Sequence, residues 1–206
     1  MDDDGTVRLE PHEVALLRGG PRAAVTVAVV DLYMRGAVEA GPPGTVRALD
    51  AEPGIAATPL PPLAETVRWC LDEPLSIRRL TRRPDVRLAV ALMRIPLAEA
   101  GMVRYPLLGP TRAARRLVRS LQERHPPPTG RRGLTANDRL LAVALHDVAA
   151  LRVLFPSFAL RAGLVERVEV GGRGLLKNSP RGTRSGSTGG TAYYCGGGGG
   201  GGGGSD

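Results

Sequence analysis

Hydrophobic positions along this chain recur in one pattern, an Ala/Val/Leu-rich helix that ends in glycine and is followed by a short β-prone step. The pattern occurs three times, with the final glycine at Gly36, Gly101 and Gly163. Glycine adopts the left-handed conformation that closes a helix at little steric cost, so each copy predicts a helix C-cap followed by a strand. The repeat therefore indicates a mainly α architecture with short β segments.

The first copy belongs to an abbreviated module that we expect over residues 6–49. Apolar spacing predicts a short helix over 11–17 and a longer one over 23–34. The glycine pair 19–20 separates the two helices, and the proline that follows favours a new first turn. We therefore expect two consecutive helices with a break between them.

A β-hairpin is expected to complete this module. The stretches 37–40 and 45–49 flank Gly41-Pro42-Pro43-Gly44, a sequence typical of a four-residue turn between two strands. Residues 50–62 contain four prolines and predict a linker to the next module.

The second module is expected over residues 63–124. The elements predicted, in chain order, are helices over 63–71, 76–82 and 84–100, a strand over 102–105, a turn over 106–110 and a helix over 112–124. Thr111 is the expected N-cap of the last helix. This order is that of a winged helix-turn-helix, and the first module is a shortened version of it.

A second linker over 125–134 leads to a third helical segment over 135–170. Thr135 and Asp138 form a capping-box-like start, Pro156 interrupts the helix, and a last strand is expected over 164–170. Residues 171–206 are dominated by Gly, Ser, Thr and Arg and predict a disordered tail. The fold class is thus mainly α with short β wings: two winged-helix-like modules, a third helical segment and a disordered tail.

Charge is concentrated in one part of the chain. The formal net charge is +8, and residues 78–132 hold fourteen arginines against three acidic residues. Lys177 is the only lysine, a bias that is typical of GC-rich bacterial genomes. The basic segment still favours an anionic partner.

The predicted helix over 112–124 is the clearest candidate for that contact. At about 100° per residue, its apolar residues fill one arc, and Arg112, Arg115, Arg116 and Arg119 fill the opposite one. Such a cationic amphipathic helix suits phosphate backbones or anionic lipid headgroups. The alternative is a solvated arginine face on a helix that packs only against its own domain.

Sequence-specific DNA binding would use the long helix of the second module. Over residues 86–100, only Arg87, Arg94 and Glu99 are polar, so Arg87 and Arg94 are the groove-facing candidates. A helix that is apolar nearly all round is otherwise a buried helix or an interface.

No catalytic or metal-binding pattern is present. His12, His125 and His146 are scattered, and His146 and Asp147 are expected within one helix, where neighbouring side chains point apart. Cys70 is expected to be a buried thiol, and Cys195 lies in the glycine tail, where an exposed or modified thiol is an alternative. We therefore expect no enzyme activity, cofactor, metal or small-molecule substrate.

The chain is expected to be cytoplasmic, with peripheral membrane association as an alternative. The first residues, Met1-Asp2-Asp3-Asp4, do not resemble a signal peptide, and no apolar stretch approaches the roughly 18 residues of a membrane span.

Three features together resemble a known family. They are Gly19-Gly20-Pro21-Arg22 before an Ala/Val-rich helix, the Thr111–Leu117 stretch before His125-Pro126, and a glycine tail with an embedded cysteine. In these the chain is similar to an uncharacterised family of domain-containing membrane proteins from high-GC bacteria of the actinobacterial type, with Gly- or Gly/Cys-rich tails. The resemblance covers most of the chain and implies no established activity.

The sequence thus favours a non-enzymatic binding or scaffold protein. Its apolar helices would contact a protein partner, and its arginine-rich segment would meet an anionic one. A DNA-binding regulator of winged-helix type and a peripheral membrane-associated protein remain the alternatives.

Overall fold

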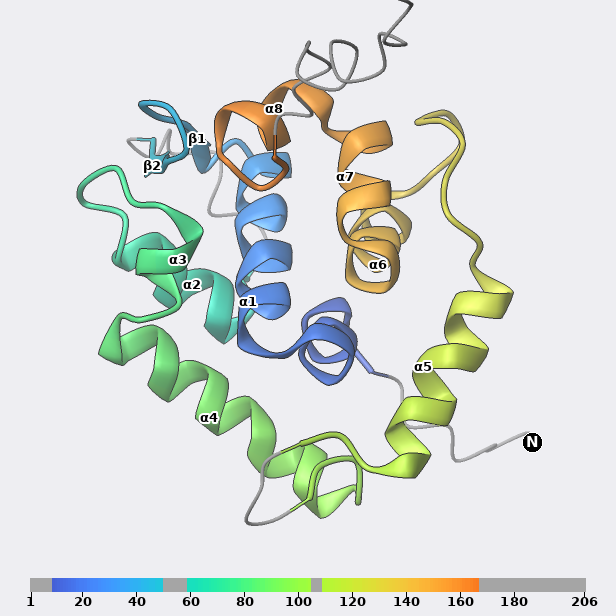
Figure 1. Ribbon diagram of the computed structural model, residues 1–206. Coiled ribbons are helices and arrows are strands. Elements are labelled where there is room, and N and C mark those ends of the chain that lie inside the picture. Colours follow the sequence, from blue (N-terminus) through green and yellow to red (C-terminus); the bar gives the residue numbers. More distant parts are fainter. Residues whose placement is uncertain (1–8, 50–58, 105–108, 167–206) are drawn as a thin grey trace, which may run out of the picture. The chain divides into compact units, whose positions relative to one another are not determined.

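The computed structural model describes residues 9–49, 59–104 and 109–166 (Figure 1). These residues form a mainly helical fold with one small antiparallel sheet, as expected. The elements are α1 (Pro11–Met34), β1 (Val38–Ala40), β2 (Val46–Ala48), α2 (Pro62–Trp69), α3 (Ile77–Leu80), α4 (Pro84–Glu99), α5 (Arg112–Arg124), α6 (Ala136–His146), α7 (Val148–Leu154) and α8 (Pro156–Arg161). All of them belong to one unit of the chain, Met1–Arg167.

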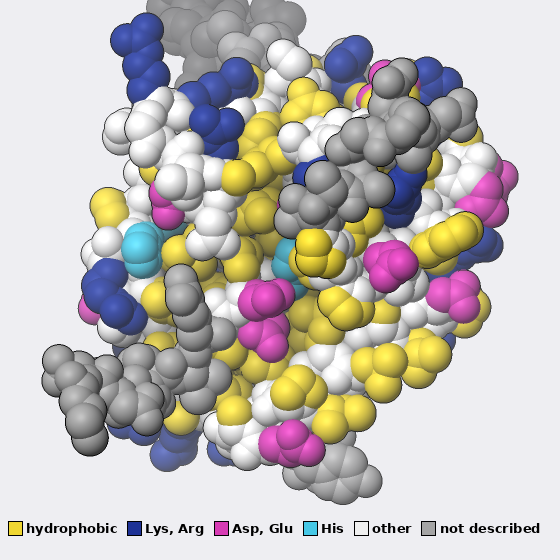
Figure 2. Space-filling view, turned by 180° about the vertical axis from the view of Figure 1, so that it is seen from behind, with side chains coloured by type: hydrophobic (Ala, Val, Ile, Leu, Met, Phe, Trp, Pro, Cys, Tyr) yellow, Lys and Arg dark blue, Asp and Glu magenta, His cyan; other side chains and the backbone are white. Residues whose placement is uncertain are grey.

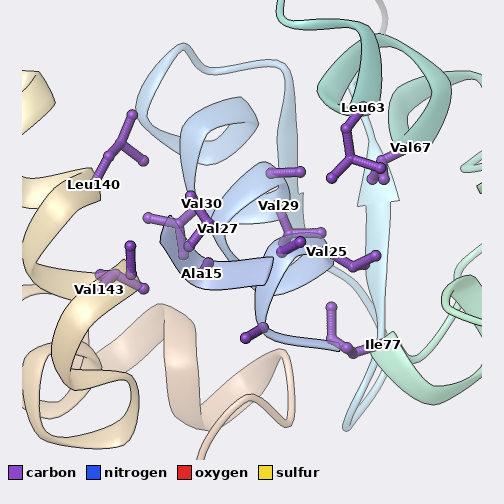
Figure 3. Packing of buried hydrophobic residues seen from close by; sticks show 14 of the residues in the cluster. Ala15, Val25, Val27, Val29, Val30, Leu63, Val67, Ile77, Leu140 and Val143 are labelled. Atoms are coloured by element: carbon purple, nitrogen blue, oxygen red, sulfur yellow. The ribbon is translucent and has the colours of Figure 1, made fainter. Parts of the chain in front are cut away.

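Helix α1 is the centre of the core. Every residue from Ala23 to Leu32 is buried, so this helix is covered on all sides. Figure 3 shows Leu63 and Val67 of α2 on one side of α1 and Val143 of α6 on the other. Because residues 23–32 of α1 are mainly Ala and Val, neighbouring helices can pack against every face of this half of the helix.

The expected break in this helix is confirmed. Gly20 departs from helical geometry at φ 72° and ψ −163°, and Pro21 begins the second half. This backbone region is essentially restricted to glycine. The two halves form one kinked element, with the kink at the glycine pair that the sequence indicated.

The predicted hairpin is also confirmed and is one residue shorter at three of its four strand ends. β1 and β2 pair antiparallel with Glu39 opposite Arg47, and these two side chains form an ion pair across the hairpin. The backbones of Val46 and Leu75 exchange two hydrogen bonds of 2.9 and 3.0 Å. The hairpin is thereby joined to the segment that leads into α3.

All three predicted glycine caps are present. Gly36, Gly101 and Gly163 have φ values of 72°, 68° and 67°. In each case the amide after the glycine donates a hydrogen bond back into the last helical turn, as in a Schellman motif. The three bonds are Ala37 N to Leu32 O at 2.8 Å, Met102 N to Leu97 O at 2.7 Å, and Leu164 N to Ala159 O at 2.9 Å.

The strands expected after these caps are only partly formed. The first cap leads into β1, whereas after the second cap the described residues show a single bridge between Val103 and Pro110. Residues 164–166 form no strand, so the expectation of one there is wrong for the described part. A strand needs a neighbour for its backbone groups, and α8 leads instead into a tight turn.

The third helical segment has a break that the sequence analysis missed. Asp147 ends α6 and precedes α7 with φ 48°. The expectation that His146 and Asp147 lie within one helix is therefore wrong. Arg18 of α1 explains the break, since its guanidinium contacts Asp147 Oδ2 at 3.0 Å and donates to Ala144 O at 2.6 Å. The capping box of Thr135 and Asp138 is confirmed.

Helix α8 is attached to α1 by aromatic packing. Tyr33 stacks on Phe158 with ring centroids 3.9 Å apart and meets Phe155 edge-on at 6.0 Å. These are the only two phenylalanines in the chain. Just beyond α8, the turn at Gly163 lies against the hairpin turn at Gly44, whose amide donates to Arg161 O at 2.9 Å.

Two buried polar residues lie within α1. His12 and Asp31 are only 3% and 2% exposed. Neither ring nitrogen of His12 has a hydrogen-bond partner among the described residues. Burial lowers the pKa of His12 below its ordinary 6.5, and the attraction of Asp31 opposes this only in part. Arg35 donates from Nε to Asp31 Oδ1 at 2.8 Å.

Two expectations fall largely outside the described residues. These are the linker over 50–62, of which residues 59–62 are described, and the disordered tail over 171–206. The division into modules stays a prediction.

The contact between the two turns predicts that an alanine destabilises the fold more at Gly163 than at Gly101, although both glycines cap a helix. A Cβ at Gly163 would lie 2.8 Å from the backbone of Gly44, whereas a Cβ at Gly101 would meet nothing within 4 Å. G101A should lower the free energy of unfolding by about 1–2 kcal/mol through its positive φ alone. G163A should lower it by about 2–5 kcal/mol because the turns must also separate. Urea denaturation of both variants measures the two losses in free energy of unfolding. Equal losses would contradict the contact between the turns.

The buried imidazole predicts acid sensitivity. Since the pKa of His12 is lower in the folded chain than in the unfolded chain, the unfolded state takes up a proton first as the pH falls below 6.5. His12 should therefore decrease the free energy of unfolding progressively as the pH falls through and below about 6.5. Thermal unfolding at several pH values should show a flatter pH dependence for H12L than for the unaltered chain. An unchanged slope in H12L would refute this assignment.

Candidate functional site

Helix α5 carries the arginine face that the sequence predicted. Thr111 caps it by accepting a hydrogen bond from Ala114 N at 3.2 Å, and it donates to Gly101 O at 3.0 Å, next to the end of α4. Ala114 and Val118 are buried on the inner side of α5, which packs against α1 and α6. The turn after α4 thereby determines where α5 begins and which side of it faces the core.

The four predicted arginines are all exposed on the outer side of this helix: Arg112, Arg115, Arg116 and Arg119. None of them forms an ion pair with an acidic residue in the described part of the chain. Four guanidinium groups without a described acidic partner, on about two turns of helix, create a positive surface, here called the α5 arginine face. Such a surface attracts polyanions and repels cationic ligands.

Helix α4 has two apolar faces instead of one. Val86, Val90 and Leu97 are buried against the core. On the opposite side, Leu88, Leu92 and Ile95 are 61%, 56% and 53% exposed. These three residues, spaced i, i+4 and i+7, form one row along the helix, here called the α4 outer row. The sequence left open whether this helix was buried or an interface, and in the described structure one side is buried and the other is uncovered.

Arg87 and Arg94, the groove-facing candidates, lie beside this row. Together with Arg82, which the sequence analysis did not select, they line a cavity of about 580 Å³. Pro21, at the kink of α1, is also part of its wall, and Leu88, Val90 and Ala91 contribute apolar surface. The structure therefore brings three arginines to one hollow. Arg87 and Arg94 are seven residues apart and therefore share a side of the helix, whereas Arg82 precedes α4 and no helical spacing relates it to them.

A second basic hollow lies under the segment that we expected to be a linker. It has a volume of about 1150 Å³ and lies between residues 124–132 and helices α6 and α7. Arg124, Arg131 and Arg132 line it, and Arg131 Nε donates to Val153 O at 3.3 Å. His146 Nε2 lies 2.6 Å from His125 O, so residues 125–132 are attached at two points. Leu134, Leu141 and Val153 contribute apolar surface to this hollow.

Trp69 is a surface feature that the sequence analysis did not identify. It lies at the end of α2, is 78% exposed and borders a hollow of about 590 Å³ with Leu49, Leu60 and Arg68. The neighbouring Cys70 is buried, as expected. Trp69 comes two residues after the buried Val67 and six after the buried Leu63, so the helical repeat places it on the other side of α2, a signal that was present in the sequence.

Catalytic and metal-binding groups are not gathered in the described part of the chain. His12 is enclosed within the core, whereas His125 follows α5 and His146 is the last residue of α6, both nearer the surface. Among the described residues, no group of three His, Cys, Asp or Glu side chains could hold a metal ion. Cys195 lies outside the described residues.

None of the described helices combines the length and the apolar character needed to cross a lipid bilayer.

Comparisons with protein-family models, curated proteins and solved structures find no match to this chain. The candidate site therefore rests on the α5 arginine face and on the outer side of α4.

Proposed function

We propose that this chain is a non-enzymatic binding or scaffold protein that uses the α5 arginine face to contact an anionic partner and its exposed apolar helix surfaces to contact a protein. The observation that carries this proposal is the set of four exposed arginines on α5, none of them in an ion pair with a described acidic residue. Unpaired cations on a rigid, capped helix keep their full attraction for an anionic ligand.

The protein-binding part of the proposal rests on two uncovered apolar features. They are the α4 outer row and the side chain of Trp69. Contiguous exposed apolar residues and solvent-facing Trp side chains are typical of interaction surfaces. A single exposed leucine would need no such explanation, but two leucines and an isoleucine in one helical row do.

A winged-helix-like arrangement of the second module is part of the same proposal. It is supported by the order of α2, α3, α4, the bridge between Val103 and Pro110, and α5. Nucleic acid is the alternative partner that this arrangement favours, with contacts mainly to the phosphate backbone because the exposed side of α4 is largely apolar. A cytoplasmic chain that associates with an anionic membrane through α5 is the other alternative.

The proposal predicts that the α5 arginine face dominates polyanion binding. Replacing Arg112, Arg115, Arg116 and Arg119 by Ala should make the full chain elute from a heparin column at clearly lower salt, since fewer counterions are displaced. The matched control, R22A/R68A/R152A/R161A, removes the same charge from other parts of the described surface and should elute near the unaltered chain.

Two further probes identify the class of anion. A labelled random duplex should bind with an affinity that falls steeply between about 50 and 200 mM salt if phosphate backbones are the partner. Cosedimentation with phosphatidylglycerol vesicles, but not with phosphatidylcholine vesicles, would indicate a membrane surface. Identical heparin elution of both quadruple variants would refute a specific role of α5.

A further inference from the structure

We propose that the outer side of α4 is a docking site for an amphipathic helix of a partner protein, with acidic residues along one edge of that helix. The proposal rests on the binding function above and names the partner of its apolar surface. The α4 outer row would contact the apolar stripe of the partner helix, and Arg82, Arg87 and Arg94 would face its carboxylates.

The first argument is the pattern of the uncovered surface. Leu88, Leu92 and Ile95 project from successive turns of α4, opposite the side that packs on α1 and α2. Helix-in-groove recognition uses anchors at i, i+3 or i+4, and i+7, which is the spacing of this row. A partner helix with the same repeat could therefore lie along α4 over about two turns.

The second argument is the distribution of charge beside the row. Arg87 and Arg94 lie on one flank of α4, and with Arg82 they surround the cavity that reaches Pro21. None of the three forms an ion pair with a described acidic residue. Carboxylates on the adjacent edge of a docked helix would each have a guanidinium within reach, in the bidentate geometry that favours Arg.

A duplex fits this surface poorly. The exposed side of α4 offers three large aliphatic side chains where base readout needs hydrogen-bonding groups. Placing that row in a groove would also leave its apolar area in contact with water and phosphate.

A membrane and a second copy of the chain fit less well than a partner helix. Asp85 is exposed on the flank of the row opposite the arginines, and the exposed Glu99 continues the row itself, four residues after Ile95. An anionic membrane would therefore meet both carboxylates together with the apolar side chains. In Figure 2, hydrophobic and acidic side chains lie side by side at the lower right, the region of α4 in that view. Three side chains also bury far less than the about 800 Å² per partner that stable protein dimers use.

The test uses the full chain and a designed probe, an N-acetylated fluorescent peptide helix with leucines at i, i+4, i+7 and i+11 and glutamates along one edge of that row. Fluorescence anisotropy should show saturable binding. L88S/L92S should weaken this binding by about tenfold or more. Because both leucines are more than half exposed, the variant should keep the unfolding temperature of the unaltered chain. A peptide with the same composition and scrambled leucines should not bind.

A charge swap separates recognition from loss of fold. R87E/R94E should bind the glutamate peptide about tenfold more weakly and should bind a peptide with lysines in place of the glutamates more tightly than the unaltered chain does. The variant lacking the four α5 arginines should bind the glutamate peptide almost unchanged. Its loss of heparin binding would then test the proposed function separately.

Three results would overturn the inference. One is the absence of saturable peptide binding, and another is equal binding by L88S/L92S and the unaltered chain. The third is assignment of the row to another occupant, either through vesicle binding that L88S/L92S abolishes or through a dimer in analytical ultracentrifugation that the same variant dissociates.

Discussion

The arrangement of this protein depends on the burial of α1 on all of its sides. A helix that is apolar around its whole circumference is stable in water only if other elements cover every face. Seven aromatic residues in the whole chain contribute little area, so the core consists of many small and medium side chains from several helices. In Figure 3, α2 and α3 cover one side of α1 and α6 covers the other. Residues more than a hundred positions apart therefore meet on the same helix.

The ends of the helices decide how the chain returns to that centre. Gly36, Gly101 and Gly163 each reverse the chain with a short hydrogen-bonded cap, so each copy of the repeat sends its next segment back toward the core. The caps are local and depend little on the rest of the fold. The break at Asp147 is different, because Arg18 from the first helix supplies its ion pair. Local glycine chemistry and one long-range contact thus produce similar turns by different means.

This difference explains which elements the sequence could predict. The helices predicted over 11–17, 23–34, 84–100 and 112–124, the break at Gly20 and the three caps follow from periodicity and from residues with special backbone preferences. All are present, with the first two helices as the halves of the kinked α1. The break at Asp147 could not be found, since the residue that stabilises it is distant in the chain. The strand expected over 164–170 is absent from its described part, 164–166, because a β-prone composition does not supply a partner strand.

For the candidate site, the sequence predicted correctly those features that depend on a single helix. The exposure of Arg112, Arg115, Arg116 and Arg119 follows from the helical repeat of α5 alone. The cavity beside α4 could not be predicted, because its wall combines α4 with Pro21 and with Arg82 from the turn before the helix. The exposure of Trp69, by contrast, follows from the repeat of α2, because it lies two residues after the buried Val67 and six after the buried Leu63.

Helix α4 presents arginines beside an uncovered apolar row, and these two features act on a ligand in different ways. Arginines act over roughly a Debye length, about 8 Å at physiological ionic strength, and therefore influence the rate of encounter. The α4 outer row acts only on contact, and its contribution depends on the apolar area removed from water, which salt does not screen. A ligand held by both should keep part of its affinity at high salt, whereas a ligand held by the α5 arginine face alone should lose nearly all of it. The salt dependence of binding thus distinguishes which of the two surfaces holds a given ligand.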